Sequence, residues 1–509
     1  MVSKKKYLLL ILFRAVGLIL SIASVLITAR YFGASQDRDF FVIAMSVTAI
    51  LPMLAYGSLT EVFRAKLVHI RETLGTERAV DSARGVVFWI SVMSAAIILL
   101  GEFGAEAVAA FFMGGKDSAS LPLLVTLIRA TLPIIFLSQL SAFWIQTLNC
   151  FNVFFIPEIF GLISSVINIA LVVLLFDKAG IFSLVISNYA SAALLVAVLV
   201  FIVRKHIPGM IRPRAGGGGG EVKQYFAAAL PFTFVYWAGQ FSAIAERKLS
   251  AGFGIGNIAL LDYAQKLLSV PQGVVFGIAA SILSPALAKH HANKHTADFM
   301  DELRSFYRFA AIVFAPCVFC MFFLNTNIGR VLFASKISAS EIHAFGVTVM
   351  IYGFGLLGVI NHIIFSQALI AQSRGRATAV IALANPVMIL VCNVTFAYKW
   401  GILGLAMSWS AGQIISGFAL MLASGIFKKG GAAMILRIYA LYLLSFSAVW
   451  AININRFLSG LSDIPQIIIN LLVFIGIMYI MMLALRFEEA KKIGMYLSLL
   501  NPGHGNAKD

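Results

Sequence analysis

The sequence has little charge and few cysteines. Only 12% of its 509 residues are Asp, Glu, Lys or Arg, whereas 60% are hydrophobic. Soluble globular proteins carry about 25% charged residues, so this composition excludes that class. The four cysteines imply no disulfide framework, and Cys317 and Cys320 lie in an apolar run with no second pair to complete a metal site.

Motifs for nucleotide hydrolysis and for hydrolytic catalysis are also missing. The chain has no phosphate-binding loop of the Walker type, so it does not itself hydrolyse a nucleotide through such a site. It has no HExxH or GxSxG motif, and no paired carboxylates, in a loop long enough to build an active site. We therefore predict that the protein is not an enzyme and needs no bound cofactor.

What the sequence does contain is a series of long apolar runs. A helix needs roughly 20 apolar residues to cross the hydrocarbon core, because its backbone polar groups must be satisfied internally there. We predict an all-α polytopic membrane protein and expect its first run to be retained as a helix, since it lacks a small-residue cleavage site. The fourteen predicted spans are 7–29, 39–63, 83–101, 121–147, 153–176, 180–203, 224–246, 258–283, 305–327, 344–371, 377–398, 401–427, 433–454 and 464–485.

The basic residues test this number of spans, because Lys and Arg resist translocation and collect on the cytoplasmic side. With the N-terminus inside, most of the 39 Lys and Arg fall in short cytoplasmic loops, as Arg64 and Arg71 do. Few fall outside, among them Arg30 and Arg38 in the first external loop. We therefore expect both termini to be cytoplasmic. The net charge of +17 reflects this topology and attraction to membrane lipids, not nucleic-acid binding.

One Gly-rich segment and a weak internal repeat divide the chain. We predict a six-helix N-terminal lobe (1–203), a flexible cytoplasmic linker (204–223), a six-helix C-terminal lobe (224–430), and two extra transmembrane helices with a cytoplasmic tail (431–509). An even number of spans separates the halves, so the repeat is parallel, and a substrate path between the lobes is expected. The repeated segments, about 220 residues apart, pair 57–67 with 277–287, Phe32-Gly33 with Phe253-Gly254, and Gly180-Ile with Gly401-Ile.

Ionisable residues inside these spans are the functional candidates, because one at a helix centre costs about 2.5–3.5 kcal/mol and usually faces a cavity or a partner. Each has a structural alternative. Asp262 and Lys266, four residues apart, can neutralise each other, and Arg129 and Glu158 can snorkel to a nearby interface. Glu61 can form an ion pair with Arg64 at a helix end, and His362 can form a hydrogen bond between helices.

Two cations are hardest to explain structurally. Arg14 lies one third of the way into the first span, and Lys266 lies within the eighth. A cavity whose deepest charges are positive suits an anion such as a phosphate or diphosphate. We expect the deep part to be net positive unless Asp262 cancels Lys266. Arg14, Lys266 and Arg129 are therefore candidate substrate-binding residues, and the others are candidates for coupling or gating.

Two segments resemble a known family. Residues 28–44 resemble the first external loop of MurJ (MviN) proteins, in which ARxFGA precedes an Asp, here Asp39, and an aromatic-rich second helix. Tyr263-Ala-Gln-Lys266-Leu, followed by Pro271 and Gly277, resembles the eighth helix of the same family. With the 6+6+2 layout, the resemblance covers nearly the whole chain. It identifies the chain as a member of the MurJ-like branch of the multidrug/oligosaccharidyl-lipid/polysaccharide exporter superfamily.

The resemblance implies a flippase of the bacterial inner (plasma) membrane that moves an undecaprenyl-diphosphate-linked saccharide outward by alternating access. It implies a role in peptidoglycan or polysaccharide biosynthesis, with assembly proteins of those pathways as further partners. Lys266 falls where the family has an eighth-helix arginine, and Asp39 matches the family's aspartate as a candidate binding residue. The family's first-helix arginines are replaced by Leu18 and Ser24, and residues 43–63 contain no basic residue.

Several alternatives stay open. The saccharide carrier is lipid II or an exopolysaccharide or O-antigen repeat unit. A cation-coupled multidrug exporter of the same superfamily is the rival transport function, and a membrane glycosyltransferase or ligase is the enzyme alternative, disfavoured by the missing loop chemistry. The sequence does not decide whether H+ or Na+ is a coupling ion.

Overall fold

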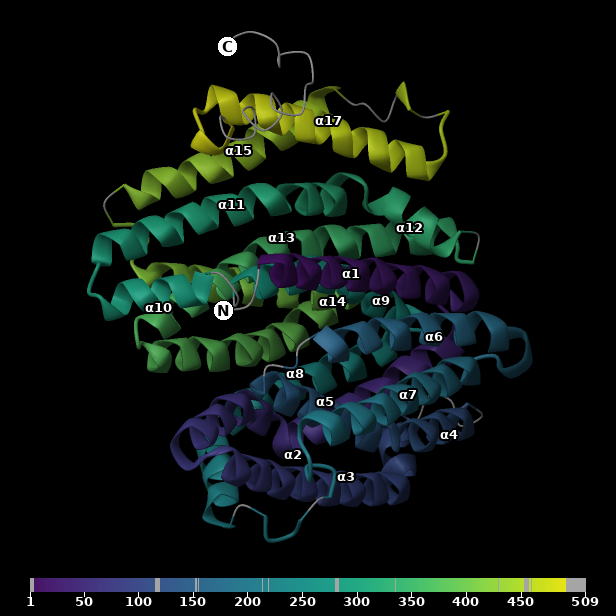
Figure 1. The fold of residues 1–509 in the computed structure, drawn as a ribbon. Coiled ribbons are helices and arrows are strands. Elements are labelled where there is room, and N and C mark those ends of the chain that lie inside the picture. The colour runs from purple at the N-terminus through teal and green to yellow at the C-terminus, as the bar shows by residue number, and fades with distance from the viewer. Residues whose placement is uncertain are drawn as a thin grey trace, which may run out of the picture. The chain divides into compact units, whose positions relative to one another are not determined.

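The computed structural model describes residues 4–114, 120–151, 153, 155–212, 214–217, 219–279, 283–334, 336–428, 430–452, 457–458 and 460–490, without the side chains of 4–12, 14, 15 and 278. These residues form helices joined by short turns (Figure 1). The helices are α1 (Lys4–Phe32), α2 (Gln36–Leu74), α3 (Thr76–Met113), α4 (Leu121–Thr131), α5 (Ile134–Cys150), α6 (Phe155–Ala179), α7 (Phe182–His206), α8 (Gly219–Gly252), α9 (Asn257–Ile278), α10 (Ser284–Ala292), α11 (Thr296–Phe323), α12 (Asn325–Phe333), α13 (Ala339–Ala371), α14 (Gly375–Ser424), α15 (Gly431–Ile452) and α17 (Asp463–Ala484).

The helices match the predicted spans in order. Ten membrane spans, one of them formed by α4 and α5 together, are long and apolar enough to cross a membrane within the described part of the chain. α14 contains the predicted span 377–398 and most of the span 401–427, and it is broken at Gly401 (φ 56°, ψ −132°), a backbone conformation open to glycine. The predicted spans 7–29, 224–246 and 258–283 overlap α1, α8 and α9. The prediction of an all-helical polytopic membrane protein is confirmed.

Some helices continue well beyond the apolar runs. α2 extends to Leu74 and α3 begins at Thr76, so Gly75 alone separates them. Arg64 and Arg71, which we expected in a short loop, therefore lie on the last turns of α2. Hydropathy marks only the part of a helix that lipid would cover, so it does not reveal these extensions.

The described residues pack into two compact units. Unit 1 comprises Met1–Val270, Ser335–Ile337 and Pro386–Ser408, and unit 2 comprises the rest. In unit 1, α2 packs against α3, α4, α5 and α8, and α6 packs against α1 and α7. In unit 2, α11 packs against α13 and α17, and α15 packs against α17. The lobes predicted from the repeat (1–203 and 224–430) stay a prediction.

The Gly-rich segment between α7 and α8 packs against α3 where it is described. Met210 is buried, and the Arg84 guanidinium donates a hydrogen bond of 2.8 Å to the carbonyl of Arg212. A Cβ atom on Gly85 would collide with the carbonyl of Gly217. The segment that we expected to be a flexible connector is thus held close to α3, and Gly85 of α3 permits that approach.

The first half of α2 positions the site described below. Ser35 caps the helix, its hydroxyl accepting a hydrogen bond of 3.3 Å from the Arg38 backbone N–H. The buried residues 40–44 then pack into an apolar core with α3, α4 and α7. Pro52 removes one backbone hydrogen bond, and the helix is kinked at Tyr56 (φ −145°, ψ 15°). Residues 36–39 therefore form the first turn of α2, and the buried turn that follows them anchors this turn in the core.

Candidate functional site

Two turns of unit 1 meet at close range and bring together residues more than 200 positions apart. The turn between α1 and α2 contacts the turn between α8 and α9, where a Cβ on Gly256 would collide with the carbonyl of Ala34. Tyr263 on α9 donates a hydrogen bond of 3.2 Å to the carbonyl of Gly33. Glycine at 256 lets the backbones approach, so the beginnings of α2 and α9 lie side by side.

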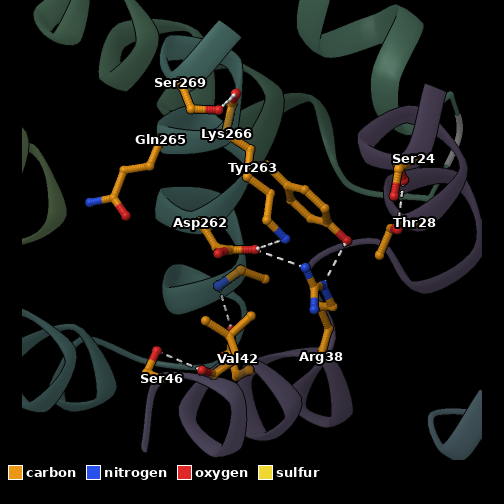
Figure 2. Close-up of polar contacts among 12 residues, drawn as sticks. Ser24, Thr28, Arg38, Val42, Ser46, Asp262, Tyr263, Gln265, Lys266 and Ser269 are labelled. Atoms are coloured by element: carbon orange, nitrogen blue, oxygen red, sulfur yellow. Dashed lines mark hydrogen bonds and ion pairs between the residues drawn. The ribbon is translucent and has the colours of Figure 1, made fainter. Parts of the chain in front are cut away.

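Arg38 is the centre of the site (Figure 2). Its side chain is 1% exposed and donates hydrogen bonds of 2.8 Å to Asp262 Oδ2 and 3.2 Å to the Tyr263 hydroxyl. The guanidinium also lies over the rings of Phe41 and Tyr263, 5.3 and 5.1 Å from their centroids. These contacts hold the arginine in one position.

Asp262 is shared between two cations. Its Oδ2 atom lies 2.8 Å from Arg38 and 2.9 Å from Lys266 Nζ (Figure 2). The side chain of Lys266 is 45% exposed and that of Arg38 is 1% exposed. Lys266 is therefore the accessible partner of this carboxylate, and Arg38 is the buried one. We call Arg38, Asp39, Asp262, Tyr263 and Lys266 the buried ion cluster.

Asp39 stabilises the start of α9. Its two carboxylate oxygens accept hydrogen bonds from the backbone N–H groups of Gly256 (2.5 Å) and Ala259 (2.7 Å). The first N–H groups of a helix have no partner within it and carry partial positive charge, so a carboxylate there is favourable. Asp39 is 5% exposed and is thus an N-terminal cap supplied by another helix.

A second set of polar side chains joins α8 to α9. Gln265 donates a hydrogen bond of 2.7 Å to Glu246 and accepts one of 3.1 Å from Arg247. Arg247 lies 4.0 Å from Glu246. Together with the buried ion cluster, these residues supply three cations and three carboxylates. Asp262 does pair with Lys266, as the alternative left open by the sequence allowed.

A cavity lies beside the exposed end of Lys266. Its volume is about 380 Å³, and it is lined by α1, α6, α7 and Lys266 of α9. Lys266 is the one charged residue among its described lining residues, and most of the others are serine, threonine or asparagine. The site thus pairs a lysine, whose countercharge is shared with Arg38, with an uncharged polar cavity.

Glu61 and Arg129 make contacts outside the buried ion cluster, and the functional roles of all the remaining sequence candidates stay predictions. Glu61 accepts a hydrogen bond of 2.6 Å from Tyr236, and Arg129 lies 3.8 and 3.4 Å from Glu102 and Glu106. In unit 2, His362 Nδ1 lies 3.2 Å from the Ser416 hydroxyl. Glu158 is in the first turn of α6. Arg14 is in α1, and its side chain lies outside the described residues.

Sequence reasoning missed Arg38, because it precedes the apolar run and was placed in the first external loop. The structure corrects this: Arg38 is in the first turn of α2 and is buried. Ser35, a favoured N-cap residue three positions earlier, was the available signal that the helix begins before Asp39. Glu246 and Arg247 were missed because they lie at and just after the end of the predicted span 224–246, and no local pattern links them to Gln265.

An all-helical multi-pass membrane protein with buried charges beside a polar cavity has the architecture of a transporter. Residues 28–476 match the family model described as "Lipid II flippase MurJ". The chain belongs to this family. The resemblance seen in the sequence is thereby confirmed, as is the prediction that the protein is not an enzyme.

Individual relatives agree with the family match. The chain is 26% identical over 422 residues to the lipid II flippase MurJ of Burkholderia cenocepacia, covering 79% of each chain. It is 22% identical over 447 residues to a probable lipid II flippase MurJ of Buchnera aphidicola, covering 84% of this chain and 86% of that one.

Solved structures show the same fold. A lipid II flippase MurJ in an inward closed conformation aligns with a TM-score of 0.77 at 20% identity, covering 93% of this chain and 99% of that one. An inward-facing multidrug resistance MATE family transporter of the MOP superfamily aligns with a TM-score of 0.66 at 12% identity, covering 82% and 95%. At these identities the likeness concerns the fold alone.

Proposed function

We propose that this protein is a flippase that moves an undecaprenyl-diphosphate-linked saccharide across the bacterial inner membrane by alternating access. Lipid II, the substrate named in the family description, is the first candidate. An exopolysaccharide or O-antigen repeat unit is the second, and the replacement of the expected first-helix arginines by Leu18 and Ser24 favours it. The proposed protein partners are cell-wall assembly proteins for the first substrate and polysaccharide assembly proteins for the second.

The observation that carries this proposal is the sharing of Asp262 between Arg38 and Lys266. When Lys266 turns toward an anion in the adjoining cavity, Asp262 keeps Arg38 as its countercharge. The buried carboxylate is then never left unpaired, which would be costly. Lys266 can therefore bind a diphosphate at a small electrostatic penalty to the site.

The rival function, export of cationic drugs, requires an acidic group that is available to the drug. Asp262 is already held by two cations, and Asp39 accepts two backbone hydrogen bonds. The polar cavity is lined by no carboxylate among the described residues. A positively charged ligand would meet Lys266 there, so the site disfavours it.

Lys266→Ala is expected to abolish complementation of a flippase-deficient strain and to leave the amount of protein in the membrane unchanged, because Arg38 still neutralises Asp262. Lys266→Arg is expected to retain activity, since the positive charge is what binds the diphosphate. Complementation and membrane abundance are measured together, with Lys178→Ala at the exposed end of α6 as the control. Normal complementation by Lys266→Ala would show that the proposed anion site is wrong.

Binding to the purified protein separates the two transport functions. We expect undecaprenyl-diphosphate saccharides to bind in preference to lipophilic cations, and added pyrophosphate to compete. Loss of the Lys266 charge should weaken binding about 10- to 100-fold, the contribution of a hydrogen bond to a charged group. Tight binding of a lipophilic cation, indifferent to pyrophosphate, would instead support a multidrug exporter.

We also infer that both termini are cytoplasmic and that two parallel six-helix lobes carry the transport path. The distribution of Lys and Arg supports the first inference. For the second, the glycines that the repeat aligns, Gly33 with Gly254 and Gly180 with Gly401, all have positive φ. Alkaline phosphatase fused after residue 509 is expected to be inactive, and a fluorescent protein fused there is expected to fluoresce. An active phosphatase fusion would contradict the orientation.

A further inference from the structure

The cavity beside Lys266 has a lining of one chemical kind. Uncharged hydroxyl and amide side chains on three helices face it, namely Ser24, Thr28, Ser165, Asn168, Asn188 and Ser191. Its volume of about 380 Å³ falls in the roughly 300–1,000 Å³ range of small-molecule sites. Such a lining fits a ligand group that is itself uncharged and rich in hydroxyl groups.

The hydroxyl groups of this cavity are arranged to accept hydrogen bonds. Thr28 donates its proton to the carbonyl of Ser24 (2.7 Å), and Ser165 donates to that of Gly161 (3.0 Å). Each oxygen keeps its lone pairs, because a hydroxyl can donate once and accept twice. Ligand hydroxyl groups can therefore donate to these oxygens.

The amide of Asn188 supplies a complementary donor. The Asn168 amide nitrogen on α6, which has two protons, lies within hydrogen-bond distance of three acceptors on α7: the Asn188 side-chain oxygen (3.1 Å) and the hydroxyls of Ser187 and Ser191 (3.3 and 3.4 Å). This network fixes the side-chain oxygen of Asn188, and the Asn188 amide nitrogen donates to no partner among the described residues. Both donors and acceptors are thus present and held in place, as recognition of sugar hydroxyls requires.

We propose that this cavity binds the first sugar of the lipid-linked saccharide, while Lys266 binds the diphosphate to which that sugar is joined. The inference rests on the proposed function and adds to it the group that the cavity recognises. In the substrate, the sugar and the diphosphate are directly bonded, and in the protein, Lys266 lines the sugar cavity itself.

The test compares undecaprenyl diphosphate with undecaprenyl-diphosphate-linked N-acetylglucosamine, which carries the sugar in place of one ionisable oxygen of the terminal phosphate. Because this charge difference is the same for every protein variant, the change that each variant makes in the ratio of the two affinities reports on the sugar. Asn188→Leu removes the amide nitrogen offered to the ligand, together with the oxygen that accepts from Asn168, and Thr28→Val removes a hydroxyl that donates to the carbonyl four residues back along its own helix. Thr126→Val on α4 is the matched control, because Thr126 makes the same bond, to Pro122, outside the cavity. Dissociation constants are measured for the full-length protein in detergent, with the melting temperature of each variant as a check on folding.

We expect the unmodified protein and Thr126→Val to bind the sugar-bearing lipid more tightly than undecaprenyl diphosphate. Each cavity variant should weaken binding of the sugar-bearing lipid about 3- to 10-fold, the contribution of one hydrogen bond, and leave binding of undecaprenyl diphosphate unchanged. Equal binding of the two lipids by the unmodified protein, or equal weakening of both by the variants, overturns this inference and leaves the flippase function standing. If neither lipid binds, the proposed function itself fails.

Discussion

Asp262→Asn is expected to destabilise the protein by about 3–5 kcal/mol, the usual cost of removing one partner from a buried ion pair. Arg38 is 1% exposed, so it would lose its countercharge with no water to replace it. Lys266, being 45% exposed, would suffer much less. The expected result is a lower melting temperature in detergent and less protein in the membrane.

Two variants establish that the unpaired arginine is the cause. Asp177→Asn, which removes an exposed carboxylate at the end of α6, should change neither measurement. Combining Asp262→Leu with Arg38→Met removes both charges and should recover part of the lost stability, because a buried pair can be replaced by apolar side chains of similar volume. A double variant no more stable than Asp262→Asn would mean that the charges of this pair are not what holds α2 to α9.

The positions of the membrane helices could be predicted from the sequence because each one rests on a strong local signal. About twenty consecutive apolar residues have few alternatives to a spanning helix. The same signal explains the errors, since it is silent where a helix leaves the membrane. α2 was therefore predicted to end at residue 63 rather than at Leu74, and its first turn, which contains Arg38, was assigned to a loop.

The candidate site was predictable only where a local spacing determined it. Asp262 and Lys266 are four residues apart, which places them on one face of a helix, and their ion pair follows. The contact of Arg38 with Asp262 spans 224 positions and depends on two turns that dock through Gly256. No periodicity in the sequence encodes that docking. The polar cavity was missed for the same reason, because its lining comes from separate helices.

The structure gives Asp39 a contact that the sequence did not indicate. The family resemblance identified it as a candidate binding residue, a role that stays a prediction. In the structure its carboxylate is occupied by two backbone N–H groups of the α9 start. It fixes the helix that carries Asp262 and Lys266, so it can affect substrate binding through their position.

Asp39→Ala is therefore expected to destabilise the protein by about 2–4 kcal/mol, because it leaves the N–H groups of Gly256 and Ala259 buried without a charged acceptor. Asp39→Asn should lose less, since its amide oxygen can still accept one of the two hydrogen bonds. The melting temperature and the complementation of a flippase-deficient strain are measured for both variants.

Asp37→Ala is the matched control, because Asp37 lies in the same first turn of α2 and is exposed. Both aspartates place a negative charge at the N-terminus of α2, so a general electrostatic effect on the dipole of α2 would appear in both variants. A cap on α9 would appear only at position 39. Equal, small effects at the two positions would refute the cap, and the placement of Lys266 beside its cavity would then have to depend on Arg38 and Tyr263 alone.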